Sequence, residues 1–220
     1  MIYYKNVIKI IGFDLDQTLY PKSPEVNELI QIYLYKKISE IKKVSLLKAK
    51  KLFGDLYKNG RGLSGSQSLK VLGIPDAQNK IQEALEKADL SKFLVKDKKV
   101  INLLEKLKNK YKNIDLITGS NFKNAKDKLE KLGLKEKIFS HIISKDNFSK
   151  SDQSAYKFWL SQYPNKKPNE FLYIGDQLMS DYLIPKEMGI ESILVNVDEK
   201  IKSINCPQLT SLLDIKKYLL

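Results

Sequence analysis

The sequence predicts an α/β fold, in which a Rossmann-like, doubly wound parallel sheet forms the core and carries an inserted all-helical domain. Short apolar segments alternate with amphipathic helical segments from residue 97 onward, which is typical of a parallel sheet with helices on both faces. The first apolar segment is separated from the others by a long stretch of helical pattern. We therefore expect a core domain of residues 1–20 and 97–220 and a helical domain of residues 21–96.

The first strand and the insertion are read from local patterns. Residues 7–13, "VIKIIGF", are short, continuous and β-branched, which indicates a buried strand. A helix should begin after Ser23 as its N-cap, with Pro24 in the first helical position. Its apolar residues recur at helical spacing at Leu29, Ile30, Leu34, Ile38 and Ile41. We expect further helices at residues 45–58 and 76–88, the latter capped by an aspartate, and a glycine-rich loop at 59–66.

The remaining segments alternate regularly. Helices are expected at residues 99–111, 121–133, 151–163, 177–189 and 209–219. Strands are expected at residues 114–120, 140–144, 170–176 and 192–197. Each strand is followed by a helix, so consecutive strands should run parallel.

Composition limits the classes of function. The net charge of +13 suggests a nucleic-acid partner, but the basic residues are 38 lysines and a single arginine, spread along the whole chain. Arginine makes the bidentate contacts that read bases and phosphates, so this composition argues against a dedicated nucleic-acid reader. The charge can still attract small anions.

The lack of long apolar runs and the scarcity of cysteine and histidine limit the possible classes of function further. No apolar run approaches the roughly 18 residues of a membrane helix, and residues 1–10 do not resemble a secretory signal. A single cysteine, Cys206, excludes an internal disulfide, which fits a cytoplasmic protein. The only histidine, His141, lies in an apolar segment where we expect a structural role, so acid–base chemistry should rest on other side chains.

Polar residues gather where the predicted strands end. Asp14 and Asp16 follow the first strand, and two residues apart on an extended chain they point the same way. Two adjacent carboxylates repel each other, which predicts a cation between them, most simply a metal ion. Because ligands bind at the carboxyl ends of parallel strands, other polar residues should converge there. They are Thr118, Gly119, Ser120, Lys150, Asp176 and Asp181.

These motifs resemble those of the haloacid dehalogenase superfamily. The matching order is Asp-x-Asp-x-Thr, then an apolar strand ending in threonine, then a lysine, then Gly-Asp with a second aspartate five residues on. The dehalogenase members of that superfamily lack the second aspartate of the first motif. The presence of Asp16 and Thr18 therefore favours a phosphatase. The motifs span residues 14–181, and the alternating segments cover nearly all the chain outside the insertion.

The resemblance implies a role for each residue. Asp14 would attack phosphorus to form an aspartyl-phosphate, and Asp16 would act as general acid and then as general base. Mg²⁺ would be bound by Asp14, by Asp16 through its backbone carbonyl, and by Asp176. Asp181 would assist the metal site through water or by fixing Lys150. The remaining phosphate ligands would be Thr118, Gly119, Ser120 and the neutralising Lys150.

The sequence departs from the family pattern at two places. The family's lysine motif often reads Lys-Pro-Asp-Pro, whereas here Lys150 is followed by Ser, Asp and Gln, so Lys145 and Lys157 compete for the same role. The threonine of the second motif is followed by Gly119 where asparagine is common, which changes little for a backbone donor.

The insertion is where the family carries a cap that closes over the site. Residues 13–23 and 56–65 resemble a subgroup of pyrimidine 5′-nucleotidases, with matches at Tyr57, Gly60, Leu63 and Gly65 and a mismatch at Asn59. Arg61, in the same loop, either contacts a base or second phosphate or is a surface arginine. Tyr20, Phe53 and Tyr57 could stack on a base or belong to the core, and Trp159 is expected in the core.

The resulting expectation is a Mg²⁺-dependent phosphomonoesterase for a small phosphorylated metabolite, with nucleoside 5′-monophosphates as the first candidates. A sugar-phosphate or broad-range phosphatase of the same superfamily is the alternative. A lysine-rich nucleic-acid-binding protein without catalysis is the rival from another class. The sequence does not determine the oligomeric state.

Overall fold

The computed structural model describes residues 7–21, 23–57, 61, 63–88, 90, 92–196 and 205–220, with only the backbone of Gln82 and Glu86. The chain forms two compact units. One consists of Ser23–Lys92, and the other combines the N-terminal residues with Phe93–Leu220. We call them the helical unit and the sheet unit.

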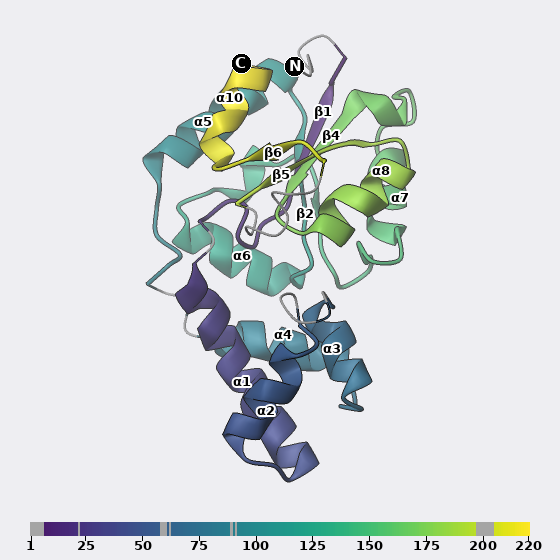
Figure 1. Cartoon of the computed structure of the whole chain (residues 1–220). Helices are drawn as coiled ribbons and strands as arrows, with labels where there is room; N and C mark the ends of the chain where they lie inside the picture. The colour runs from purple at the N-terminus through teal and green to yellow at the C-terminus, as the bar shows by residue number, and fades with distance from the viewer. Residues whose placement is uncertain are drawn as a thin grey trace. The chain divides into compact units, whose positions relative to one another are not determined.

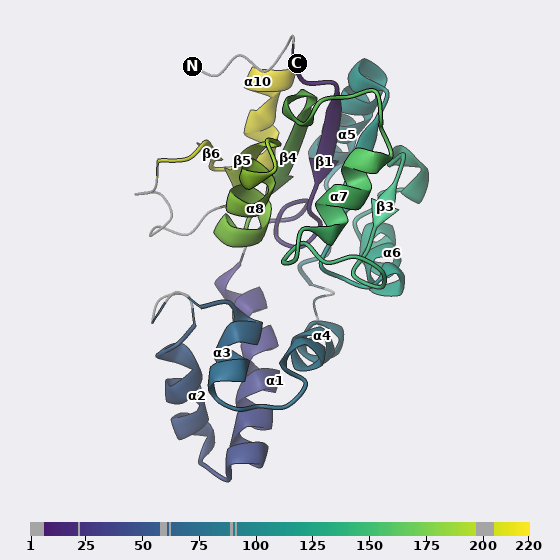
Figure 2. The same cartoon turned by 90° about the vertical axis from the view of Figure 1, so that its right-hand side faces the viewer.

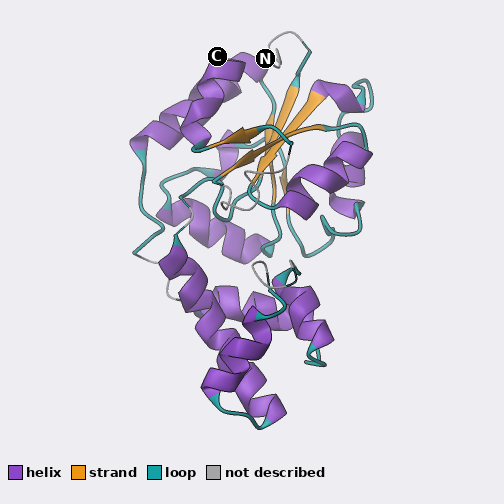
Figure 3. Ribbon diagram, in the orientation of Figure 1, coloured by secondary structure: helices purple, strands orange, loops and turns teal. Residues whose placement is uncertain are grey.

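The sheet unit is built on six parallel strands in the order β3-β2-β1-β4-β5-β6 (Figure 3). The strands are β1 (Ile10–Phe13), β2 (Ile114–Ile117), β3 (Ile142–Ile143), β4 (Phe171–Gly175), β5 (Glu191–Val195) and β6 (Gln208–Leu209). The predicted doubly wound sheet is confirmed. The central strand β1 pairs with β2 on one side and β4 on the other, so the carboxyl ends of these three strands lie together.

Helices cover both faces of the sheet. α5 (Lys98–Tyr111) and α10 (Lys216–Leu219) lie on one face, and α7 (Ser154–Ser161) and α8 (Ile184–Glu187) lie on the other (Figures 1 and 2). α6 (Phe122–Lys131) connects β2 to β3. Short helical turns are η1 (Glu136–Ile138), η2 (Pro168–Glu170), the π-helical η3 (Leu178–Leu183) and η4 (Leu212–Ile215).

The core on the α7 side packs tightly around one indole ring. Trp159 is fully buried and its ring contacts those of Phe171 and Tyr173 on β4 edge to face. A Cβ at Gly12 of β1 would lie 2.7 Å from the Trp159 ring. The glycine is therefore what lets the indole reach the central strand. The predicted core position of Trp159 is confirmed.

The helical unit contains α1 (Pro24–Lys42), α2 (Leu46–Gly54), α3 (Gly65–Val71) and α4 (Ala77–Lys87). Ser23 caps α1 as predicted, since its side chain accepts a hydrogen bond from the Glu25 amide. The unit's own core includes Leu34, Ile38, Phe53 and Leu69.

The helix predicted from the spacing of apolar residues is confirmed as α1, although Leu29 and Ile41 of that pattern are exposed. Two other local predictions were wrong. Asp76 precedes α4 in a left-handed conformation (φ 51°) and its side chain makes no capping hydrogen bond. The predicted glycine-rich loop ends earlier than expected, because Gly65 already begins α3.

In the sheet unit, the predicted helix at 177–189 is a π-helical turn followed by the single turn α8. Residues 208–209 form the edge strand β6, and Leu209 is the first residue of the predicted last helix. Among the described residues, no helix combines the length and the apolar character needed to cross a bilayer.

Candidate active site

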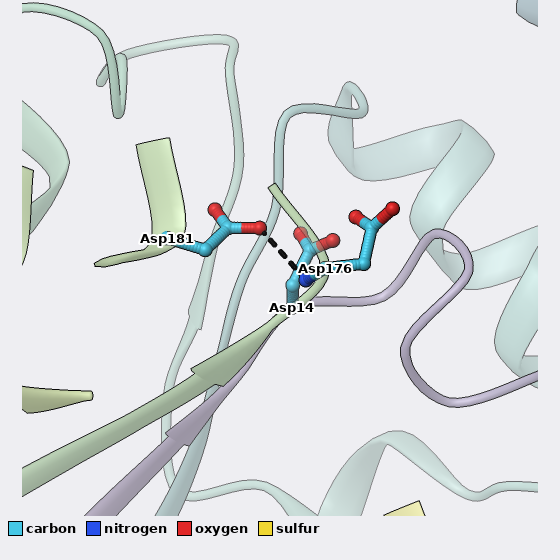
Figure 4. A group of neighbouring side chains, drawn as sticks. All are labelled: Asp14, Asp176 and Asp181. Atoms are coloured by element: carbon cyan, nitrogen blue, oxygen red, sulfur yellow. Dashed lines mark hydrogen bonds between the residues drawn. The ribbon is translucent and has the colours of Figure 1, made fainter. Parts of the chain in front are cut away.

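Three buried aspartates meet at the carboxyl ends of β1 and β4. Asp14 follows β1, Asp176 follows β4, and Asp181 comes from η3. Each offers one carboxylate oxygen within 4.8 Å of those of the other two, and each residue is no more than 4% exposed. Figure 4 shows the side chains of Asp14 and Asp176 beyond the ends of their strands, with Asp181 beside them. The backbone ladder continues to Asp14, whose amide donates to the Ile174 carbonyl at 2.8 Å, and this fixes where its side chain begins.

Lys150 contacts two of these aspartates. Its Nζ lies 2.8 Å from Asp14 Oδ1 and 2.7 Å from Asp181 Oδ1, and it donates to the Tyr173 hydroxyl at 3.3 Å. These contacts use all three ammonium donors. Of the three lysines considered from the sequence, the structure therefore brings Lys150 to the aspartates.

Asp181 anchors the loop that follows β4. Its Oδ2 accepts from the amides of Asp176 and Gln177, and its Oδ1 accepts from Lys150 and from the Ser180 hydroxyl. Four donors occupy the roughly four lone-pair positions of a carboxylate. Gly175 makes this approach possible, because a Cβ there would lie 2.4 Å from Asp181 Oδ2.

The electrostatics of the cluster favour an added cation. Burial raises the pKa of Asp14 well above its usual range, and the nearby carboxylates of Asp181 and Asp176 raise it further against the opposing effect of Lys150. Burial alone would lower the pKa of Lys150, but Asp14 and Asp181 raise it well above its usual value. Lys150 forms ion pairs with two of the three buried carboxylates, Asp14 and Asp181. This donor set of hard oxygens with excess negative charge fits Mg²⁺ or a similar divalent ion.

Asp16, in the turn that follows β1, belongs to a second cluster. Its Oδ1 accepts from Lys128 Nζ at 2.6 Å and from the Tyr20 hydroxyl at 2.9 Å, and its Oδ2 accepts from Ser120 Oγ at 2.8 Å. Lys128 also donates to Ser120 Oγ at 3.0 Å. Burial acts to raise the pKa of Asp16, but Lys128 and the two hydroxyl donors outweigh it and lower that pKa below its usual value.

The turn after β2 carries the other predicted phosphate ligands. Thr118 is buried, and its Oγ1 accepts from the Ser120 amide at 3.0 Å. A Cβ at Gly119 would meet no atom within 4 Å, so there is empty space beside the backbone at this position. The Ser120 side chain faces Asp16 and Lys128, so it joins the second cluster.

The residues of the helical unit that the sequence suggested for substrate binding lie in different surroundings. Arg61 is exposed, and its amide donates to the Asp55 carbonyl. Phe53 is buried against the rings of Tyr35 and Tyr57, which supports the core alternative for Phe53. Gly60 and Asn59 of the predicted loop lie outside the described residues.

Sequence reasoning missed Lys128 and did not foresee the contact of Tyr20 with Asp16. A signal for Lys128 is present, because it falls between Ala125 and Leu129 on the buried face of α6. A lysine on the apolar face of an amphipathic helix needs a buried partner. The role of Tyr20 has no comparable signal, since it depends on the path of the turn after β1.

His141 has the structural surroundings that the sequence predicted. Its Nδ1 lies 3.1 Å from Asp115 Oδ1 and from the Tyr163 hydroxyl. Asp115 is fully buried and also accepts from Trp159 Nε1 at 2.8 Å. This network ties β2 to α7 through buried hydrogen bonds.

Comparison with known proteins agrees with this architecture. A family model for haloacid dehalogenase-like hydrolases matches residues 10–195. A phosphatase of the same superfamily from Thermococcus onnurineus has a similar structure, with a TM-score of 0.63 and 20% sequence identity over 96% of this chain and 97% of that one. A haloacid dehalogenase-like hydrolase from Streptococcus pneumoniae matches with a TM-score of 0.66 and 19% identity over 96% of this chain and 98% of the other.

A 2-haloacid dehalogenase from Pseudomonas syringae is also similar, with a TM-score of 0.53 and 17% identity over 96% of this chain and 97% of that one. At such identities the likeness shows the fold alone. Because phosphatases and dehalogenases share it, the chemistry has to be argued from the residues of the site. No curated protein sequence matches the chain at a significant level.

Proposed function

This chain belongs to the family of haloacid dehalogenase-like hydrolases, and from that premise we propose that it is a Mg²⁺-dependent phosphomonoesterase. The observation that carries the proposal is the pair of side-chain clusters around Asp14 and Asp16. One carboxylate lies among acids and a lysine, and the other is held by hydroxyl and ammonium donors. That arrangement supplies a nucleophile and a separate acid–base group.

The proposed reaction has two half-reactions. In the first, a carboxylate oxygen of Asp14 attacks phosphorus and the bond from phosphorus to the ester oxygen breaks. Asp16, whose lowered pKa requires that it first gain a proton from solvent, gives that proton to the departing oxygen to release the alcohol. In the second, Asp16 takes a proton from water, the water oxygen attacks phosphorus, and the bond to Asp14 breaks to release inorganic phosphate.

The other residues bind and orient the phosphoryl group. Thr118 Oγ1 and the open backbone at Gly119 lie at the end of β2, where donors can hold phosphate oxygens. Lys150 neutralises negative charge beside Asp14. The direct metal ligands are proposed to be Asp14, Asp176 and the Asp16 carbonyl. When bound, the ion would neutralise phosphate charge and polarise the phosphoryl oxygens.

Asp181 is proposed to act without direct coordination of the ion. Its oxygens already accept hydrogen bonds from four donors. It would hold Lys150 and the Asp176 backbone in place, or contact the ion through water.

The substrate class is proposed from the helical unit, which would act as a cap. The resemblance of residues 13–23 and 56–65 to pyrimidine 5′-nucleotidases makes nucleoside 5′-monophosphates the first candidates. Arg61 is an exposed guanidinium in that unit and would contact a base or a second phosphate. The cytoplasmic location stays a prediction from the single cysteine.

The test is phosphate release from a panel of nucleoside 5′-monophosphates and sugar phosphates, with Mg²⁺ and with a chelator. Asp14→Asn should abolish metal-dependent release. Arg61→Ala should raise KM for nucleotides by about tenfold and leave sugar phosphates unchanged, whereas Lys51→Ala, which removes another exposed cation of the same unit, should change neither.

The outcomes separate the alternatives. Preference for sugar phosphates with no effect of Arg61→Ala would replace the nucleotidase proposal with the sugar-phosphatase alternative. No release from folded protein, together with steeply salt-dependent binding of DNA or RNA, would favour the non-catalytic nucleic-acid binder instead.

A further inference from the structure

One lysine of α6 differs from the others on that helix. Lys123, Lys126 and Lys131 are exposed, whereas Lys128 is only 7% exposed. Burying an ammonium group is costly unless it is paired and hydrogen-bonded. The buried ammonium group of Lys128 therefore requires a specific acceptor or carboxylate beside it.

That partner is Asp16. Lys128 Nζ contacts Asp16 Oδ1 at 2.6 Å and Ser120 Oγ at 3.0 Å, and Ser120 Oγ in turn donates to Asp16 Oδ2 at 2.8 Å. The three groups form a closed triangle in which both carboxylate oxygens are fixed. Tyr20 adds a donor to Oδ1 at 2.9 Å.

The two lysines of the site thus contact different carboxylates. Lys150 pairs with Asp14 and Asp181, and Lys128 pairs with Asp16. Asp16 lies in the turn that follows β1, outside the ladder of the sheet, so the strand does not fix its side chain. Lys128 on α6 holds one oxygen of the Asp16 carboxylate, and Ser120 holds the other.

We propose that Lys128 is a positioning residue that fixes the orientation of the Asp16 carboxyl for proton transfer to the leaving group. The inference rests on the proposed function, because it assumes that Asp16 is the general acid. Proton transfer depends on placement to within a fraction of an ångström, so a carboxyl free to rotate would act less often. In this role Lys128 acts through its contact with Asp16 and does not bind the phosphate ester.

The experiment uses a series of aryl phosphates whose leaving groups differ in basicity. A p-nitrophenolate ion leaves without a proton, whereas a phenolate ion benefits strongly from one. Lys128→Met keeps the length and apolar stem of the side chain and removes its charge. The control is Lys131→Met, which removes an exposed charge from the same helix.

We expect Lys128→Met to lower kcat/KM for phenyl phosphate about tenfold more than for p-nitrophenyl phosphate, and Lys131→Met to change neither. Asp16→Asn should show the same selective loss. Adding Lys128→Met to Asp16→Asn should cause little further loss, because both changes remove one function.

Two results would overturn the inference while leaving the proposed function intact. One is an equal loss across the whole series in Lys128→Met, which would indicate a structural or phosphate-binding role. The other is additive loss in the double variant. If the unmodified protein hydrolyses none of the esters while its thermal unfolding shows a folded chain, the proposed function itself fails, and that result is distinguishable from both.

Discussion

Burial and neighbouring carboxylates raise the pKa of Asp14 against the effect of Lys150, so its negative charge is unfavourable in the metal-free fold. The folded-state pKa lies above the unfolded-state value of about 3.9. The folded state therefore binds the proton more tightly, and the free energy of unfolding falls as the pH rises between these two values. At pH values above the raised pKa of Asp14, the ionised side chain destabilises the folded state.

Asp14→Asn should therefore stabilise the metal-free protein. We expect its melting temperature in EDTA at pH 8 to exceed that of the unmodified chain, by roughly 2–4 °C for each kcal/mol gained. Lys150 keeps Asp181 as its partner in this variant. The difference should shrink as the pH falls below the raised pKa of Asp14. Thermal unfolding across pH measures it, and a lower melting temperature for the variant at pH 8 would contradict the prediction.

Gly175 gives a second prediction about single residues. A Cβ at this position would lie 2.4 Å from Asp181 Oδ2 and 2.5 Å from its Cβ and Cγ. Gly175→Ala should therefore displace Asp181, destabilise the chain by about 1–3 kcal/mol and weaken activity by at least about tenfold. Urea unfolding and phosphatase assays measure the two effects.

Gly54→Ala is the matched control, because a Cβ at Gly54 meets no atom within 4 Å. Its stability and activity should stay close to those of the unmodified chain. If Gly175→Ala behaves in the same way, the close approach of Asp181 to the strand is not required for the site.

How far the sequence predicts the site depends on which contact is considered. Asp14 and Asp176 were expected together because strand ends of a parallel sheet meet at one edge, which follows from topology. Lys150 was expected there from its place before a helix and from the lysine motif of the family that the sequence resembles. The contact of Lys128 with Asp16 also depends on how α6 is rotated against the sheet. Helix rotation is set by packing over the whole face, which a sequence pattern reports only approximately.

At the scale of elements, strands and long helices were predictable because their apolar periodicity extends over many residues. β6 has two residues and was missed, since it pairs with β5 only at the sheet edge. The π-helical η3 was read as an ordinary helix. Its wider turn accompanies Asp181, whose side chain holds the backbone of Asp176 and Gln177. Such turns are frequent at functional sites and have no simple sequence signal.

The connection between β2 and α7 gives a prediction at this scale. The Tyr163 hydroxyl donates to the buried carboxylate of Asp115 at 2.8 Å, whereas the Tyr111 hydroxyl donates to the neutral Leu219 carbonyl at 3.0 Å. Hydrogen bonds to charged groups contribute about 1.5–3 kcal/mol, and those between neutral groups about 0.5–1.5 kcal/mol. Tyr163→Phe should therefore destabilise the chain more than Tyr111→Phe in urea unfolding.

Tyr163→Phe and Tyr111→Phe should change the stability of the chain without changing its activity. Asp115 lies three residues before Thr118, which is about 10 Å along the strand, so kcat/KM per folded molecule should be unchanged in both variants. Equal destabilisation by the two changes would show that the charge of Asp115 adds nothing to the bond. A selective loss of activity in Tyr163→Phe would show that the network also supports the site.

For the whole molecule, the excess of lysine is the property that no single contact explains. The formal net charge is +13, and buried acids at the site contrast with lysines on the helices of both units. A surface of this sign raises the local concentration of anionic substrates, and the attraction weakens as salt screens it.

We expect kcat/KM for a dianionic phosphate ester to fall several-fold when NaCl is raised from about 0.05 to 0.5 M at constant Mg²⁺. The kcat should change little, because the groups around Asp14 and Asp16 are buried and screened less than surface charges. Steady-state kinetics at several salt concentrations separates the two constants. A kcat/KM that is independent of salt would mean that the surface lysines do not act on substrate capture. A parallel fall of kcat would instead locate the salt effect in the buried clusters.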